Sequence, residues 1–598
     1  MPEFSQKRSS QYRAEPVEGP IDDVMGWGSD VPAAMLRHLG IPFIALTPGA
    51  SYRGLHDSLV NHLGNERPEM ILCLHEEHAV AIAHGYAKVT GRAMAVALHS
   101  NVGLMHGTMA LFNAFADRAP MLVLGATGPM DATERRPWID WLHTAQDQAA
   151  LVRNFLKWDD QPASPAATPE AMTRGWKIAN TAPCGPVYIN LDASDQEMPL
   201  PAPVPLPDLL RHAPLPDAAP DAGSLSAATE VLALSQSPVI LFGRGARNER
   251  AMKARIALAE RLGAPMLSDL KTGAMVPSDH PLHAGPPFNK LSAPARAALQ
   301  GADVILSLGW VDLGGLLKQA FPDSMPRATI IHAGLDHQLH SGWNQEHFSL
   351  PPVDIELACS ADAMTSALLD SLPAAVRPRP VMPPVKQPAE GDGTVLTNRD
   401  VARALKKAAD DQPITFAAMA RGWPVDILPH RHPLDYLGKD GGGGIGSGPG
   451  LTIGSALALR GSGRLVVGSL GDGDTLMSIN ALWTAAKYQI PALFIVANNR
   501  SYFNDELHQE NVALRRGRNP ANAWVGQRLD NPAPDIAALA RAQGVAAIGP
   551  IRDIGALEAA MSEAVETVRA GLPFLLDVHI DPRQGREGAV RRNTKAAV

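Results

Sequence analysis

Apolar and polar residues follow one another along this chain in a pattern that predicts strands alternating with helices. The clearest case lies near the C-terminus, where residues 464–470 and 490–497 form apolar runs that predict buried strands. Between the two runs, apolar side chains recur at three- and four-residue steps, at Leu476, Ile479, Leu482, Trp483 and Ala486. That period is typical of a helix lying on a sheet. The segment therefore predicts a β-α-β unit whose two strands run parallel.

The same alternation recurs in three blocks, residues 29–195, 226–372 and 396–582. In the first block strands are expected at residues 41–46, 70–74, 93–98, 121–124 and 186–191, with helices over residues 55–63 and 76–90. In the second block they are expected at residues 238–242, 303–308 and 328–332. These patterns predict an α/β fold with three doubly wound parallel-sheet domains.

Proline-rich stretches separate the blocks and predict linkers at residues 196–225 and 373–395. Residues 1–28 are polar and predict a flexible arm, and residues 583–598 predict a polar tail. The arm lacks the apolar core of a secretion signal, and the chain has no apolar run of about 18 residues that would suggest a membrane span.

Composition narrows the class of protein. Among 598 residues, 53 basic and 61 acidic side chains give a net charge of −8 without long runs of one sign, so nucleic acid is not an expected partner. The three cysteines, Cys73, Cys184 and Cys359, lie far apart in the sequence, which is typical of reduced thiols in a cytoplasmic protein. We expect a cytoplasmic enzyme that acts on a small molecule, without a membrane partner.

Candidate metal ligands follow the two strands near the C-terminus. Parallel strands joined by a crossover end at the same sheet edge, so Asp472 and Asn499 are expected side by side. Their side-chain oxygens and the Ser501 carbonyl are hard donors that suit Mg²⁺. Gly471 and Gly473 let the chain turn sharply and let a diphosphate approach the backbone.

Gly471-Asp-Gly473, followed 25 residues later by Asn498-Asn499, resembles the signature of the thiamine diphosphate enzymes. Residues 30–580 as a whole are similar to the acetolactate synthase and benzoylformate decarboxylase branch. The resemblance implies a pyrimidine-binding, a middle and a diphosphate-binding domain in that order, with thiamine diphosphate and Mg²⁺ as cofactors. It also implies a homodimer or homotetramer in which the cofactor lies between two subunits.

The resemblance also assigns roles to single residues. Glu76 stands nine residues before Gly85 of Gly-Tyr-Ala, the spacing of the glutamate that contacts the cofactor's aminopyrimidine and activates it. Ile445, in Gly443-Gly-Ile-Gly446, takes the place of the apolar residue that holds the cofactor bent. His99 and, with less support, His280 match histidines that transfer protons or pack near the substrate.

Several departures from benzoylformate decarboxylase bear on the substrate. Thr47-Pro-Gly-Ala-Ser51 has an insertion, so either Ala50 or Ser51 is a candidate substrate contact, and Ser51 is preferred. His106 stands where asparagine is expected. Residues 416–420, Phe-Ala-Ala-Met-Ala, replace a polar run on the pocket wall. Asn504 and His508, four apart on an expected helix, are candidate contacts to a polar or negatively charged substrate.

These residues favour non-oxidative decarboxylation of a 2-oxo acid, a lyase reaction. The alternative is an acetolactate synthase-like carboligase, a transferase that passes the acyl unit to a second carbonyl compound. A third reading is cleavage of 2-hydroxyacyl-CoA or oxalyl-CoA. Gly243-Arg-Gly-Ala-Arg247 could cradle a nucleotide diphosphate but lacks the third glycine of the dinucleotide fingerprint, and a plain turn is favoured. Donor, acceptor and any nucleotide on the middle domain stay open.

Overall fold

The fold is that of a computed structural model, which describes residues 24–581 apart from residues 270, 286–289, 337–349, 375–377, 379, 381, 383–394 and 440. Most of the predicted arm and the whole predicted tail lie outside the described residues. Contacts group the described chain into one unit up to Pro216 and a second unit from Asp217 onward. The division between the two falls inside the predicted first linker.

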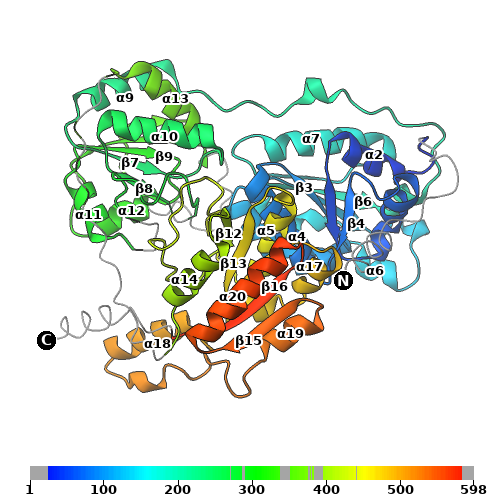
Figure 1. Cartoon of the computed structure of the whole chain (residues 1–598). Helices are drawn as coiled ribbons and strands as arrows, with labels where there is room; N and C mark the ends of the chain where they lie inside the picture. The colour runs from blue at the N-terminus through cyan, green and yellow to red at the C-terminus, as the bar shows by residue number, and fades with distance from the viewer. Residues whose placement is uncertain are drawn as a thin grey trace. The chain divides into compact units, whose positions relative to one another are not determined.

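The first unit is built on a six-stranded parallel sheet with the order β2-β1-β3-β4-β6-β5 (Figure 1). Its strands are β1 (Phe43–Leu46), β2 (Glu69–Leu72), β3 (Met94–Leu98), β4 (Met121–Thr127), β5 (Trp158–Asp160) and β6 (Pro186–Asp192). Strands β3, β4 and β6 are buried along their whole length, as parallel strands covered by helices on both faces require.

Helices of the first unit connect these strands. They are α2 (Asp30–His38), α3 (Arg53–Asp57), α4 (Glu76–Thr90), α5 (Ser100–Ala116), α6 (Ile139–His143), α7 (Thr168–Asn180) and α8 (Ala193–Glu197). Helix α4 has the predicted bounds: His75 Nδ1 accepts the Glu77 amide at its start, and Gly91 ends it with a left-handed φ of 66°. The helix expected over residues 55–63 is instead α3 followed by a π-helical turn, Ser58–His62.

The second unit holds two five-stranded parallel sheets, ordered β11-β10-β9-β7-β8 and β12-β13-β14-β16-β15 (Figure 1). The first sheet contains β7 (Pro238–Phe242), β8 (Met266–Ser268), β9 (Val304–Leu308), β10 (Thr329–Ala333) and β11 (Ile355–Leu357). The second contains β12 (Ile414–Ala418), β13 (Leu465–Gly471), β14 (Leu493–Asn498), β15 (Ala546–Ile551) and β16 (Phe574–His579). Each sheet has its own buried apolar core.

The connections in the second unit are helical. The helices around the first of its sheets are α9 (Ala222–Leu234), α10 (Glu249–Leu262), α11 (Ala293–Gln300), α12 (Leu313–Ala320) and α13 (Ala361–Ser371). Those around the second are α14 (Asn398–Ala409), α15 (Gly448–Ala458), α16 (Asp472–Met477), α17 (Ala481–Lys487), α18 (Phe503–Arg515), α19 (Ile536–Ala542) and α20 (Ile554–Arg569). The prediction of an α/β fold with three parallel sheets is confirmed.

A second helix also differs from its prediction. The apolar period between β13 and β14 predicted a single helix, whereas the chain forms α16 and α17 with a break at residues 478–480. The Ser478 hydroxyl donates to the Gly446 carbonyl, and the Ala481 amide donates to the Ser478 carbonyl at 2.9 Å. The hydrogen bond between Ser478 and Gly446 ends α16 early and links it to the glycine segment before α15.

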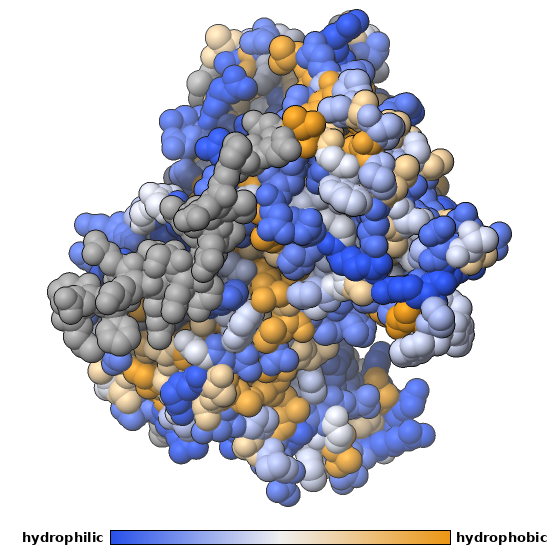
Figure 2. Space-filling model, turned by 90° about the vertical axis from the view of Figure 1, so that its right-hand side faces the viewer, coloured by the Kyte–Doolittle hydropathy of each residue, from blue (hydrophilic) through white to orange (hydrophobic). Residues whose placement is uncertain are grey.

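The face drawn in Figure 2 is mostly hydrophilic, with smaller hydrophobic areas between the polar ones. Some large apolar side chains are exposed, and Trp138 and Trp141 have 70% and 67% of their surface accessible. Nowhere in the described chain does a helix have both the length and the apolar character needed to cross a membrane.

Candidate functional site

The end of β13 and the start of α16 present the predicted metal loop. Strands β13 and β14 pair with Gly471 opposite Ala497, so Asp472 and Asn499 leave the sheet at the same edge. Asp472 is buried, and its two carboxylate oxygens accept the amides of Gly473 at 2.8 Å and Ser501 at 3.1 Å. Burial raises the pKa of Asp472, and the backbone donors act against that shift. A nearby cation would stabilise its charged form.

The side chain of Asn499 shows whether a metal ion would suit this site. Its Oδ1 atom is buried and has no hydrogen-bond partner within the described part of the chain, and the residue lines the same cavity as Asp472. A buried oxygen without a donor costs free energy unless a ligand satisfies it. The oxygens of Asp472 and Asn499 are therefore suited to Mg²⁺, with the Ser501 carbonyl a third donor of the same hard type.

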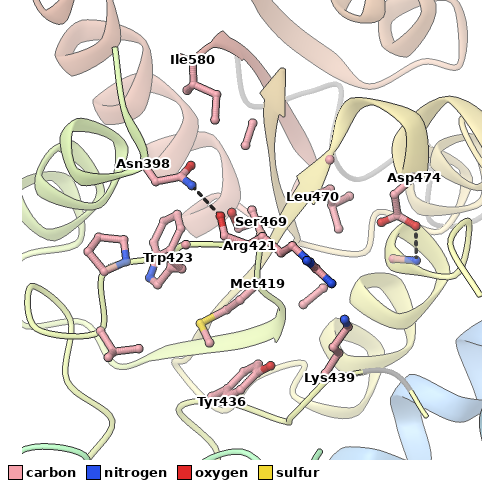
Figure 3. A pocket seen from close by; sticks show the side chains of 18 of the residues that line it. Asn398, Met419, Arg421, Trp423, Tyr436, Lys439, Ser469, Leu470, Asp474 and Ile580 are labelled. Carbon is pink, nitrogen blue, oxygen red and sulfur yellow. Dashed lines mark hydrogen bonds between the residues drawn. The ribbon is translucent and has the colours of Figure 1, made fainter. Parts of the chain in front are cut away.

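The cavity beside this loop has a volume of about 1200 Å³ and extends from the carboxyl ends of β12, β13 and β14 to the loop at residues 278–285. Ile445 lines it with 45% of its surface exposed. The glycine segment around Ile445 is fixed by Asp474, whose Oδ1 accepts the Gly446 amide at 2.6 Å (Figure 3). At Gly473 a Cβ atom would lie 2.5 Å from the ring of Tyr502, so only glycine fits this turn.

Further lining residues follow β12. Met419 and Trp423 contribute apolar surface, and Leu470 on β13 adds to it (Figure 3). The Arg421 guanidinium points into the cavity, and its Nη1 donates to Asn504 Oδ1 on α18. The departure at residues 416–420 suggested an apolar wall. Arg421 directly follows those residues and places a positive charge on this wall. The sequence feature that could have identified it is its position just after a strand that ends at the ligand-binding edge.

Glu76 begins helix α4 in the first unit and is 7% exposed. Its Oε2 lies 3.1 Å from His106 Nδ1 on α5, and the His106 ring stacks on His75 with centroids 4.9 Å apart. Donor atoms of Glu76 and these two histidines lie within 4.8 Å of one another. Sequence reasoning placed His106 near the substrate, and its contact with Glu76 depends on how α4 and α5 pack.

His99 directly precedes α5 at the carboxyl end of β3. Its Nδ1 lies 2.8 Å from Ser51 Oγ and accepts the Ser51 amide at 3.4 Å, so the neutral ring carries its proton on Nε2. The pKa of His99 is lowered first by burial and then by His143, whose ring centroid is 4.8 Å away, while Glu76 acts in the opposite direction. Of the two residues left open in the turn, Ser51 is the one that contacts His99.

The remaining predicted residues lie in the second unit. His280 lines the cavity, but its Nδ1 accepts the Leu282 amide at 3.2 Å and its Nε2 lies 3.4 Å from Glu260 Oε1. Both ring nitrogens thus have structural partners. His508 has a 64% exposed side chain, pairs with Asp505 at 3.4 Å and is not among the described residues that line the cavity. Of the helical pair, Asn504 alone lines the cavity.

The glycine-rich turn after β7 is tightly packed. A Cβ atom at Gly243 would lie 1.9 Å from the Gly309 carbonyl oxygen, and one at Gly245 would lie 2.3 Å from the Arg255 guanidinium. The turn therefore brings two loops together, as the plain-turn interpretation expects.

Three family models match the chain, and each is described as part of a thiamine pyrophosphate enzyme. They are the N-terminal TPP binding domain at residues 27–151, the central domain at residues 225–366 and the C-terminal TPP binding domain at residues 417–578. A benzoylformate decarboxylase of Pseudomonas aeruginosa is 27% identical, over 85% of this chain and 91% of its own. An acetolactate synthase large subunit of Haemophilus influenzae is 24% identical, over 94% of this chain and 97% of its own.

A solved structure of benzoylformate decarboxylase from Polynucleobacter necessarius superposes with a TM-score of 0.77. The two chains are 21% identical, and the match covers 93% of this chain and 100% of the other. At that identity the similarity concerns the fold alone.

Proposed function

This chain belongs to the thiamine pyrophosphate enzymes, and on that premise we propose that it decarboxylates a 2-oxo acid non-oxidatively, releasing carbon dioxide and an aldehyde. Thiamine diphosphate, when bound, supplies the nucleophilic carbon and the electron sink that this cleavage needs. Asp472, Asn499 and Ser501 would hold Mg²⁺, and Gly471, Gly473 and Ile445 would border the cofactor. The unpartnered Asn499 oxygen beside the buried Asp472 carboxylate supports this assignment.

Glu76 would hold the aminopyrimidine through its carboxylate. Its place at the start of α4 and its burial favour a fixed hydrogen-bond acceptor rather than a solvated surface charge. His106 restricts the carboxylate further, because its Nδ1 lies 3.1 Å from Glu76 Oε2. We propose that His106 positions Glu76.

The observation that carries the choice of decarboxylation is the partly buried contact between His99 and Ser51. Burial and the neighbouring His143 lower the pKa of His99, so its protonated ring is a stronger acid and gives up its proton more readily. Proton delivery to the product is what releases an aldehyde. Ser51 orients the ring through Nδ1. In the protonated ring Nδ1–H can donate to Ser51 Oγ, and the proton on Nε2 is then the one available for the product.

Carboligation is the second candidate function. The acetolactate synthase among the relatives favours this alternative.

Removal and return of the cofactors test the cofactor assignment. Protein stripped of metal and cofactor should release carbon dioxide from 2-oxo acids only after both Mg²⁺ and thiamine diphosphate are added. Asp472→Ala should weaken the binding of both by at least about tenfold in titration calorimetry, because the buried metal ligand is lost. Asp505→Ala, at the cavity rim, is the matched control. Unchanged binding in Asp472→Ala would contradict the assignment.

We also propose a homodimer or homotetramer. Helices α5 and α6 of the first unit expose Met105, Trp141 and Leu142, and Asn101 Nδ2 links the two helices by donating to the Leu142 carbonyl at 2.9 Å. Exposed apolar side chains of this size favour association. Light scattering should give two or four times the mass of the 63.5 kDa chain, and a single-chain mass would contradict the proposal.

A further inference from the structure

We propose that the cavity of the second unit accepts 2-oxo acids that carry a second anionic group, and that Arg421 binds that group. The inference rests on the proposed function and names its substrate class. A guanidinium can bind either the second anionic group of a substrate or the diphosphate of the cofactor. The experiment described below distinguishes these two anions.

Arg421 is held in place at both ends. It follows β12 at the carboxyl edge of the sheet, where its backbone carbonyl accepts Asn398 Nδ2 at 3.0 Å (Figure 3). Its side chain is oriented by the hydrogen bond from Nη1 to Asn504 Oδ1, which joins residues 83 positions apart. Arg421 is exposed, and this hydrogen bond favours one orientation of its guanidinium, which lowers the side-chain entropy cost of binding a ligand.

The charge of Arg421 lacks a carboxylate partner within the described chain, unlike that of two other arginines lining the cavity. Arg399 binds Asp426 through two hydrogen bonds of 3.1 and 2.9 Å, and Arg431 contacts Asp279 at 2.6 Å. Within the described chain the Arg421 guanidinium donates its one hydrogen bond to the neutral amide of Asn504. Because a guanidinium has five N–H donors, most of its fork remains available for a carboxylate.

The surroundings of Arg421 indicate the shape of the ligand. Met419, Trp423 and Leu470 line the wall near it and would pack against a hydrocarbon segment, while Lys439 adds a second positive charge to the lining (Figure 3). Asn504, the only member of the predicted substrate pair that lines the cavity, acts through the arginine. A 2-oxo acid with a short methylene chain and a terminal carboxylate combines these features.

Matched substrates test the inference. The probes are 2-oxoglutarate and 2-oxoadipate, each against a neutral isostere in which an isopropyl group replaces the terminal carboxylate, 5-methyl-2-oxohexanoate and 6-methyl-2-oxoheptanoate. The loaded wild-type enzyme should prefer at least one diacid by about tenfold or more in kcat/KM. Arg421→Gln should lower kcat/KM for the diacid by about 10- to 100-fold, the range for a hydrogen bond to a charged group. The same substitution should change kcat/KM for the neutral isostere by less than about threefold.

Controls separate substrate binding from other effects. Arg431→Gln, which removes a carboxylate-paired arginine at the same cavity, should leave the preference for the diacid unchanged. Arg421→Lys should recover only part of it, because an ammonium cannot form the two parallel hydrogen bonds of a guanidinium. Circular dichroism and calorimetric titration with thiamine diphosphate check that each variant is folded and binds its cofactor.

Three outcomes would overturn the inference. If Arg421→Gln lowers kcat/KM equally for the diacid and for its neutral isostere, and also binds thiamine diphosphate more weakly, the guanidinium serves the cofactor. If the wild type turns over only the neutral isosteres, the inference fails and the proposed function stands. If wild type releases carbon dioxide from neither these acids nor a wider panel of 2-oxo acids, the proposed function fails as well.

Discussion

Glu76 combines three properties that an ordinary glutamate at a helix start does not share. It is buried, it contacts His106, and a Cβ atom on Gly103 would lie 3.0 Å from its Oε1. A charge favoured only by the helix dipole would need none of these. The combination supports a carboxylate held for a purpose beyond the stability of α4.

The first prediction concerns the loss of that carboxylate. Glu76→Gln should lower carbon dioxide release by at least about 100-fold, the lower range for loss of an acid–base group, because a neutral amide cannot play the part of the carboxylate. Calorimetric titration should still show thiamine diphosphate binding, since the metal loop lies in the other unit.

Its neighbour provides the control. Glu77 is half-buried, and burial raises its pKa, but only the Glu77 backbone amide has a role in capping α4. Glu77→Gln should therefore keep turnover within about threefold of wild type, as expected of a substitution away from the reacting groups. Near-normal turnover in Glu76→Gln, with a large loss in Glu77→Gln, would mean that the count from Gly85 selects the wrong glutamate.

Sequence reasoning at this scale depended on spacing. Asp472 and Asn499 could be placed at one edge because parallel strands fix where their carboxyl ends lie. The contact between His106 and Glu76 could not be predicted, because it depends on the packing of α4 on α5. Arg421 was missed because its one signal, a place just after a strand, depends on β12, which was not predicted.

At the scale of elements, β14 and β16 share a buried polar pair next to the metal loop. Asp577 on β16 accepts Asn498 Nδ2 from β14 at 2.8 Å, and both residues are almost fully buried. Burial raises the pKa of Asp577 to about 6, an effect that the hydrogen bond from Asn498 opposes and the charges of Asp535 and Asp472 reinforce. The ionised carboxylate therefore costs stability at neutral pH.

Asp577→Asn should stabilise the cofactor-free protein above pH 6, since the amide stays neutral and still accepts from Asn498. In the wild type, the pKa of Asp577 is raised from 3.8 to about 6 by folding. The protonated carboxyl is therefore compatible with the folded state below about pH 4, and the wild type loses stability as pH rises to 6. The gain in unfolding free energy is at most about 3 kcal/mol at pH 8 and about half of that at pH 5. Urea unfolding at both pH values measures it.

The exposed Asp411→Asn is the matched control and should change the urea midpoint little at either pH. A gain in Asp577→Asn that did not depend on pH would show that packing, and not ionisation, explains the difference.

How far the elements could be predicted depended on their length and burial. Helix α4 was predicted with its full bounds because small residues recur along it as far as Ala87 and Gly91 follows its last residue. Strands β5, β8 and β11 have three residues each, too few to show a period, and were not predicted. The longer strands β12, β15 and β16 were not predicted either. The break between α16 and α17 was hidden because the apolar period continues through it while a contact to Gly446 ends the helix.

At the scale of the whole molecule, the residues proposed for catalysis are divided between two units. Glu76, His99 and Ser51 belong to the first, and the metal loop and Arg421 belong to the second. The three-sheet α/β architecture and the enzyme family could be predicted, because both rest on patterns that extend along the chain. The substrate could not, because single side chains on loops decide it.

The most direct test of the central claim is the identity of the product. Enzyme loaded with Mg²⁺ and thiamine diphosphate would be given aromatic, branched and dicarboxylic 2-oxo acids, with and without an added aldehyde, while carbon dioxide is measured and the organic product identified. We expect one free aldehyde per carbon dioxide, even when the acceptor is present. A 2-hydroxyketone or acetohydroxy acid as the main product would contradict decarboxylation as the native reaction and make the protein a carboligase.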